Sequence, residues 1–274
     1  MEGMALSTFL VAAAQMTSTA DRARNLEMAL RLVNEAADLG AKLVGLPENF
    51  AFMGKDEDRI NGAETLQGPT ISALRDVARH RRVHVLAGSI AEQVDVPGKT
   101  ANTSVLLSDD GAVLAAYRKI HLFDVAIPDG ARYAESETVA PGDRAVLVPT
   151  PLGRIGLTVC YDLRFPELYR NLSALGAEIL TIPAAFTLYT GKDHWEVLLR
   201  ARAIENLAYV LAPAQAGRHS ANRVTFGNAM VVDPWGVVLA RCPGEGEGVC
   251  IAPVRRERLE QVRRELPALK HRKL

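Results

Sequence analysis

The stretch RIGLTVCYDLRFPELYR, residues 154–170, predicts a strand, a turn and a helix in succession. In its first half Ile155, Leu157 and Val159 alternate with small residues, which is typical of a buried strand. Cys160 closes that strand and precedes the helix, where a helix dipole would stabilise a thiolate. Cys160 is therefore a candidate nucleophile, although free cysteines are also common as buried structural residues.

The composition is that of an ordinary globular protein. It has 274 residues, of which 48% are hydrophobic and 23% charged. Lys plus Arg number 32 and so do Asp plus Glu, so the charge gives no reason to expect nucleic acid or an anionic membrane as partner. No linker-like stretch divides the sequence. We expect one domain over residues 1–274, with a core over about 8–255 and a C-terminal helix and tail over 256–274.

The cysteine pattern predicts a reducing environment. The chain has only three cysteines, Cys160, Cys242 and Cys250. Their odd number and the lack of CxxC spacing argue against a disulfide framework or a zinc site. The N-terminal MEGMALSTFLVAAAQM lacks a basic segment, and its short apolar run predicts a first strand rather than a signal peptide. We therefore expect a cytoplasmic protein without metal or cofactor.

Strand and helix patterns alternate along the whole chain. Helical spacing is found over 19–38, 68–82 and 194–206. Strand patterns cover residues 9–15, 41–49, 83–90, 102–108, 112–120, 177–186, 208–216, 228–234 and 236–242. Asp109-Asp110-Gly111 is a hairpin signature. These patterns predict an α/β fold of mixed sheets with outer helices. The longest stretch without a pattern, residues 120–145, is expected to be functional.

Three polar residues of different chemistry stand at the ends of predicted strands. Glu48 follows VGLP, Lys119 ends AVLAAYRK, and Cys160 ends RIGLTV. Each of them alone would be taken for a surface residue. Together they supply a carboxylate that can accept a thiol proton, an ammonium that can stabilise an oxyanion, and a thiol nucleophile. This combination predicts thiol-based acyl transfer.

The segments LPENFAF, YRKIHLFD and CYDLRFPE carry these residues. In order and spacing they resemble the three signature regions of the nitrilase superfamily, the carbon–nitrogen hydrolases, and the resemblance covers about residues 8–255. It implies a four-layer α-β-β-α sandwich, usually dimerised across a helical face, so a homodimer or higher homo-oligomer is expected. It also implies that Glu48 is the general base, Lys119 the oxyanion support and Cys160 the nucleophile of an amidase.

The family site often includes a second glutamate before a Pro-Gly. Glu135 in AESETVAPG matches that position, and Glu137 is the alternative. The backbone N–H of Tyr161 is a candidate oxyanion donor, while His121 and His194 are interpreted as structural. The remaining candidates for contact with a small amide substrate are Arg164, Phe52, Phe186, Thr187 and Arg202, with Arg218 as a further cation for a substrate carboxylate.

The segments HWEVLLRARAIE, AQAGRH and FGNAMVVDPWG indicate a branch of the family. They resemble the enzymes that hydrolyse deaminated glutathione to 2-oxoglutarate and cysteinylglycine. The ω-amidases, which act on 2-oxoglutaramate or other small linear amides, are near relatives and stay open as an alternative. Ala126 and the loop IPDGARYAES, residues 127–136, depart from the common pattern and leave the substrate undecided. A non-catalytic binding protein on the same fold is the alternative of a different class.

Overall fold

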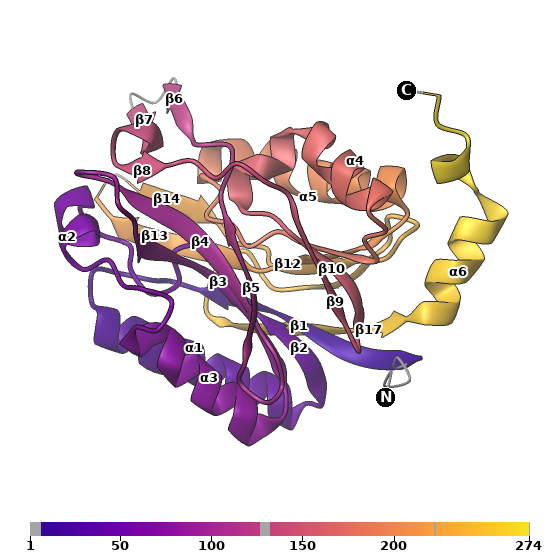
Figure 1. The fold of residues 1–274 in the computed structure, drawn as a ribbon, viewed down its shortest axis with the longest axis horizontal. Coiled ribbons are helices and arrows are strands. Elements are labelled where there is room, and N and C mark those ends of the chain that lie inside the picture. The colour runs from indigo at the N-terminus through magenta and orange to yellow at the C-terminus, as the bar shows by residue number, and fades with distance from the viewer. Residues whose placement is uncertain (1–6, 127–131, 222, 274) are drawn as a thin grey trace.

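Two large β-sheets lie face to face between two layers of helices (Figure 1). The computed structural model describes residues 7–126, 132–221 and 223–273. Over this part of the chain the layers follow the order helix, sheet, sheet, helix, so the predicted α-β-β-α sandwich is confirmed. The side chains between the two sheets form one continuous apolar core, and a second core lies between the first sheet and its helices.

The first sheet is built around a long central strand, β1 (Thr8–Met16). β1 pairs in parallel with β2 (Ala41–Gly45), and antiparallel along its other edge with β17 (Gly248–Arg255). The sheet continues from β2 through β3 (His84–Gln93), β4 (Thr100–Leu107) and β5 (Val113–Arg118); beyond β1 it continues through β13 (Ala214–Ser220) and β14 (Arg223–Phe226). The short β8 (Val139–Ala140) pairs with β4.

The second sheet contributes the other inner face. Its strands run in the order β16 (Val238–Arg241), β15 (Met230–Val232), β12 (Tyr209–Ala212), β11 (Ile179–Thr181), β10 (Gly153–Leu157) and β9 (Val146–Thr150). The stretch between β5 and β9 holds short elements where no pattern was recognisable, namely the hairpin β6 (Asp124–Ala126) with β7 (Arg132–Ala134) and the 3-10 helix η1 (Glu135–Glu137).

Helices cover both outer faces (Figure 1). α1 (Arg22–Asp38) and α3 (Pro69–Arg81) pack on the first sheet, and α4 (Pro166–Ala174) and α5 (Leu188–Asn206) pack on the second. Asp21 caps the N-terminus of α1, because its side chain accepts the N–H of Arg24. α2 (Asp56–Asn61) follows β2 at the rim, and α6 (Arg256–Glu265) extends from β17. Among the described residues, no helix has both the length and the apolar character needed to cross a membrane.

Most predicted elements are present, although their bounds differ, and two of these differences bear on the site. The hairpin at residues 109–111 joins β4 to β5, and Gly111 adopts a φ of 83°, as its turn requires. The strand predicted over 208–216 is divided at Pro213 into β12 and β13, which belong to different sheets. The helix predicted to begin at His194 begins six residues earlier, at Leu188. These differences matter because β13 and the start of α5 border the candidate site.

Candidate active site

Glu48 stands just beyond β2, on a segment fixed by backbone contacts. The N–H of Leu46 donates to the carbonyl of Leu86, and the side-chain amide of Gln215 donates from Nε2 to the backbone carbonyl of Glu48 itself. Its carboxylate, only 3% exposed, accepts the N–H of Ala185 at Oε2 over 2.9 Å. The other oxygen is therefore left to face the remaining polar groups of the site.

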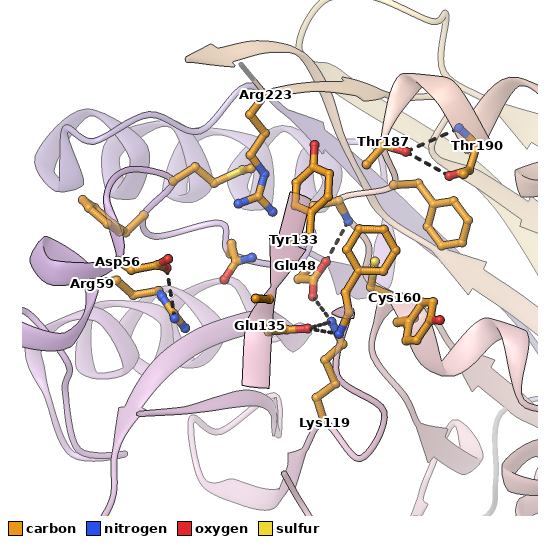
Figure 2. A pocket seen from close by; sticks show the side chains of 18 of the residues that line it. Glu48, Asp56, Arg59, Lys119, Tyr133, Glu135, Cys160, Thr187, Thr190 and Arg223 are labelled. Atoms are coloured by element: carbon orange, nitrogen blue, oxygen red, sulfur yellow. Dashed lines mark hydrogen bonds and ion pairs between the residues drawn. The ribbon is translucent and has the colours of Figure 1, made fainter. Parts of the chain in front are cut away.

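Lys119 lies between two carboxylates (Figure 2). Its Nζ is 2.9 Å from Oε1 of Glu48 and 2.8 Å from Oε2 of Glu135, and the side chain is 2% exposed. Lys119 directly follows β5, and its backbone carbonyl accepts the N–H of Gly142. Glu135 begins η1 and also accepts the N–H of Phe123 at 2.7 Å. The ammonium of Lys119 thus contacts both carboxylates.

Cys160 occupies a sharp turn between β10 and α4. Its φ is 48°, a left-handed conformation that non-glycine residues rarely adopt, and its N–H donates to the carbonyl of Pro183 at 2.9 Å. The turn continues as the 3-10 helix η2 (Cys160–Arg164). This geometry directs the sulfur toward Glu48 and Lys119 (Figure 2).

Asp162 holds the turn at Cys160 in place through hydrogen bonds. Its Oδ2 accepts the N–H of Val159 at 2.8 Å and the hydroxyl of Tyr117 at 2.7 Å. Its Oδ1 accepts the N–H of His121 and lies 2.7 Å from that residue's Nδ1. The His121 ring also stacks on Phe165 with 3.7 Å between centroids. The fully buried carboxylate therefore ties the end of β10 to the segment after β5.

The electrostatic surroundings of Cys160 favour the neutral thiol. Burial, followed by the negative charge of Glu48, raises the pKa of Cys160 well above its usual value, and the positive charge of Lys119 opposes this only in part. We had expected a helix dipole to stabilise the thiolate. That expectation was wrong for the free protein, because the residue enters a short 3-10 turn and lies in a buried site beside a carboxylate. A base is thus needed to activate the thiol.

Lys119 remains charged despite its burial. Burial lowers the pKa of an ammonium, but the charges of Glu135 and Glu48 outweigh it and hold the pKa of Lys119 well above its usual value. For Glu135 burial raises the pKa, yet the charge of Lys119 and hydrogen bonds from Lys119 and Phe123 together hold it below the usual value. The site therefore keeps a positive charge beside the thiol.

A cavity opens above these groups and receives most of the predicted contact residues. It holds about 970 Å³ of atom-free space, part of which is open to solvent. Phe52, Tyr161, Arg164, Phe186 and Thr187 line it together with Glu48, Lys119, Glu135 and Cys160. The loop that departs from the family pattern also lines the cavity, through Arg132, Tyr133 and Ala134. The rest of its differing part, residues 127–131, lies outside the described residues.

Three other predicted residues do not face this cavity. Arg202 is 5% exposed, donates to the carbonyl of Leu163 and pairs with Glu205, so its expected contact with substrate is not supported. Arg218 donates to the carbonyl of Ala221 and is absent from the lining. Glu137 points outward and pairs with Arg132, which leaves Glu135 as the second glutamate at the site.

Sequence reasoning missed several residues around the site. Asn102 on β4 donates to both glutamates, and Arg59, Arg132 and Arg223 line the cavity. Arg59 pairs with Asp56. The signal for Asn102 was an amide inside a buried strand, where a polar group normally requires a hydrogen-bond partner. The arginines carried no such signal, because surface arginines are common in any sequence.

Comparison with known proteins places this geometry in a family. The model of the carbon-nitrogen hydrolase family matches residues 10–264. The chain belongs to the carbon–nitrogen hydrolase family. The prediction of a cysteine-dependent amidase of this family is therefore confirmed.

Relatives of this carbon–nitrogen hydrolase are similar over nearly its whole length. A protein of Synechocystis sp. (strain PCC 6803 / GT-S) named deaminated glutathione amidase is 49% identical over 270 residues, covering 97% of this chain and 99% of its own. The Homo sapiens protein of the same name is 47% identical, covering 96% and 82%. The crystal structure of Saccharomyces cerevisiae Nit3, a member of branch 10 of the nitrilase superfamily, superposes with a TM-score of 0.88 at 30% identity, covering 100% and 99%.

Proposed function

We propose that this chain hydrolyses the amide bond of deaminated glutathione that joins the 2-oxoglutaryl group to cysteinylglycine. The observation that carries the proposal is the pocket that holds Cys160 beside Glu48, Lys119 and Glu135, lined by arginines. Two relatives at 49% and 47% identity, both named for this substrate, support the choice among amides.

The first half of the reaction acylates the enzyme. The carboxylate of Glu48 removes the proton of the Cys160 thiol, and the sulfur attacks the amide carbonyl carbon. The negative charge that develops on the carbonyl oxygen is stabilised by Nζ of Lys119 and the backbone N–H of Tyr161. Glu48 then donates its proton to the amide nitrogen as the C–N bond breaks, so cysteinylglycine leaves and a thioester remains.

The second half regenerates the thiol. Glu48 removes a proton from water, and the resulting hydroxide attacks the thioester carbonyl at the same oxyanion position. The C–S bond breaks, 2-oxoglutarate leaves with the new C–O bond, and Cys160 recovers its proton from Glu48. Glu135 holds Lys119 in position between the two carboxylates, 2.8 Å from its Nζ. The raised pKa of Cys160 supports this scheme, because a neutral thiol needs the base.

Two arginines support a substrate with two carboxylates. Arg164 and Arg223 both line the cavity, and among the described residues neither forms an ion pair with a carboxylate. Arg164 instead lies over the rings of Tyr161 and Phe186, which holds its guanidinium at the wall of the pocket. Deaminated glutathione carries one carboxylate at each end, and arginine binds carboxylates through two parallel hydrogen bonds.

The direct test compares substrates with the purified protein. Deaminated glutathione should yield equal amounts of 2-oxoglutarate and cysteinylglycine by mass spectrometry, with a kcat/KM at least about tenfold above that for 2-oxoglutaramate. Cys160→Ala should release no product. Cys242→Ala is the matched control, since Cys242 is also a buried free cysteine but lies outside the cavity, and it should retain activity.

Three results would redirect the proposal. A higher kcat/KM for 2-oxoglutaramate, with ammonia as product, would make the protein an ω-amidase. Product formation by Cys160→Ala equal to that of the unmodified protein would contradict the nucleophile. Absence of a thioester adduct in the mass of the intact protein, with every amide tested, would point to a binding protein.

We also propose a homodimer formed through the outer face of α5. Large apolar side chains are exposed there and on the adjoining turn, namely Val197, which is 65% exposed, Ile204, Trp235 and Val237. α5 contacts this turn directly, since Arg200 donates to the carbonyl of Gly236. Val197→Glu should produce monomers in light scattering, whereas Val113→Glu on β5 should not; a monomeric unmodified protein would refute the dimer.

A cytoplasmic location completes the proposal. Cys160, Cys242 and Cys250 are all free thiols, which a reducing compartment preserves. Cell fractionation with an antibody against the protein should recover it with cytoplasmic markers. Recovery in an oxidising compartment would refute the assignment.

A further inference from the structure

Asn102 contacts the three charged residues that lie beside Cys160, namely Glu48, Lys119 and Glu135. It lies on β4 with 3% of its surface exposed, behind the carboxylates rather than in the cavity lining. Its Nδ2 donates to Oε1 of Glu48 and to Oε1 of Glu135, both at 3.0 Å. Its backbone carbonyl accepts the N–H of Lys119 at 2.9 Å. One residue thus fixes the relative positions of Glu48, Lys119 and Glu135.

The orientation of the Asn102 amide follows from its neighbours. Its Oδ1 is buried and has no hydrogen-bond partner among the described residues. Reversing the amide would place that oxygen against two carboxylate oxygens, which repel it when ionised. The amide therefore directs both N–H groups at the carboxylates and leaves its own oxygen unpaired. An unpaired buried oxygen is unfavourable, which indicates that the two donated hydrogen bonds are needed.

The charges around Glu48 and Glu135 explain why the two hydrogen bonds from Asn102 are needed. Among the described residues, Glu48 and Glu135 form ion pairs with one ammonium, that of Lys119, and the thiol of Cys160 beside Glu48 is neutral. Four arginines, Arg59, Arg132, Arg164 and Arg223, also line the cavity, but in the part of the chain that the structure describes none of them pairs with either carboxylate. A buried set with an excess negative charge tends to take up a proton. Hydrogen bonds donated to a carboxylate favour its ionised form. Asn102 supplies one such bond to each carboxylate from a group without charge.

We propose that Asn102 is a positioning residue that keeps Glu48 and Glu135 ionised together, so that Glu48 is ready to accept the thiol proton. The proposal rests on Glu48 being the base of the proposed function. Without Asn102, each carboxylate loses a donated hydrogen bond, so ionising both of them together becomes less favourable. Activity should then recover as the pH is raised.

The pH dependence of kcat/KM tests this proposal. Asn102→Leu retains the size of the side chain and removes both donors. Its acid limb should shift upward by about one pH unit, with kcat/KM roughly tenfold lower at pH values below both limbs and recovery as the pH is raised above them. Asn102→Asp adds a third carboxyl against the pair and should shift the limb further. KM should change much less than kcat, because the side chain does not line the cavity.

Asn206→Leu is the matched control. Asn206 is also a fully buried asparagine with an unpaired Oδ1, but its Nδ2 donates to the carbonyl of Arg202, away from the site. It should lower the unfolding temperature and leave the acid limb unchanged.

The outcomes separate this inference from the proposed function. If the unmodified protein cleaves no amide, the proposed function fails. If it is active and the acid limb of Asn102→Leu coincides with its own, Asn102 is a structural residue and the inference is overturned, even if the variant is less stable.

Discussion

The carboxylate of Glu48 accepts the backbone N–H of Ala185 at 2.9 Å, although the two residues are 137 positions apart. Glu48 follows β2 of the first sheet, and Ala185 follows β11 of the second. This bond joins the two sheets at the end where the cavity opens. It fixes Oε2, so Oε1 is directed at Lys119 and Asn102. The position of the proposed base therefore depends on how the sheets pack against each other.

Gly88 on β3 controls the position of the Glu48 segment. A Cβ at this position would lie 1.9 Å from the carbonyl oxygen of Pro47 and 2.3 Å from that of Leu46. Both are backbone atoms, so no side-chain rotation relieves the clash. Gly88→Ala should displace Glu48 and lower kcat about 100-fold, with a loss of about 1–3 kcal/mol in unfolding free energy. Gly248→Ala, which meets no atom within 4 Å, should leave both unchanged. Normal kcat in Gly88→Ala would contradict this argument.

Removing the charge of Lys119 should be costly for both folding and activity. Lys119→Met leaves Glu48 and Glu135 buried without their cation, which should lower the unfolding free energy by about 3–5 kcal/mol. Loss of the oxyanion donor should reduce kcat about 100- to 1,000-fold. Adding Glu135→Gln to Lys119→Met removes one excess charge and should restore part of the stability in denaturant titrations, without restoring kcat. A double variant less stable than Lys119→Met would refute the charge account.

The pKa of Cys160 should fall when Glu48 loses its charge. A thiol is neutral below its pKa, so the raised pKa of Cys160 keeps it protonated throughout the neutral range. Burial is the main cause and remains in Glu48→Gln, but the repulsion by the Glu48 charge is removed while Lys119 still attracts a thiolate. Thiolate absorbance in the ultraviolet should therefore appear at lower pH in Glu48→Gln than in the unmodified protein, while kcat falls. Cys160→Ser supplies the baseline for Cys242 and Cys250. Thiolate absorbance that appears at equal or higher pH in Glu48→Gln would contradict this account of the Cys160 pKa.

The sequence predicted the site's chemistry better than its supporting contacts. Glu48, Lys119 and Cys160 could be recognised because each is a polar residue at the end of an apolar strand, and the structure brings them together. Asn102 could not be assigned a partner, since its contacts are 54 and 33 residues away and depend on sheet pairing. Arg202 had the right charge, but the sequence does not reveal that its side chain turns toward Leu163.

The start of α5 is a part of the fold that the sequence alone did not predict. The apolar spacing that predicts a helix begins at His194, while residues 188–193 include a glycine that weakens the pattern. Gly191 lies inside α5, and a Cβ at this position would lie 2.3 Å from Cβ of Phe226 on β14, so only glycine fits there. The glycine permits close packing rather than ending the helix, and only the tertiary structure reveals this.

Arg164 and Arg223 provide a test of substrate size. Deaminated glutathione carries a carboxylate on each side of the scissile amide, whereas 2-oxoglutaramate carries only one. A charge-assisted hydrogen bond to a carboxylate contributes about 1.5–3 kcal/mol. Arg164→Gln and Arg223→Gln should therefore each lower kcat/KM for deaminated glutathione about 10- to 100-fold.

The same variants should differ on the smaller substrate. Only one of them should lower kcat/KM for 2-oxoglutaramate, because a single carboxylate cannot contact both ends of the pocket. Arg218→Gln, which removes a guanidinium outside the cavity lining, should leave both substrates unaffected. If neither Arg164→Gln nor Arg223→Gln changed kcat/KM for deaminated glutathione, the carboxylates of the substrate would have to be bound by other groups, and Arg59 and Arg132 are the remaining lining arginines.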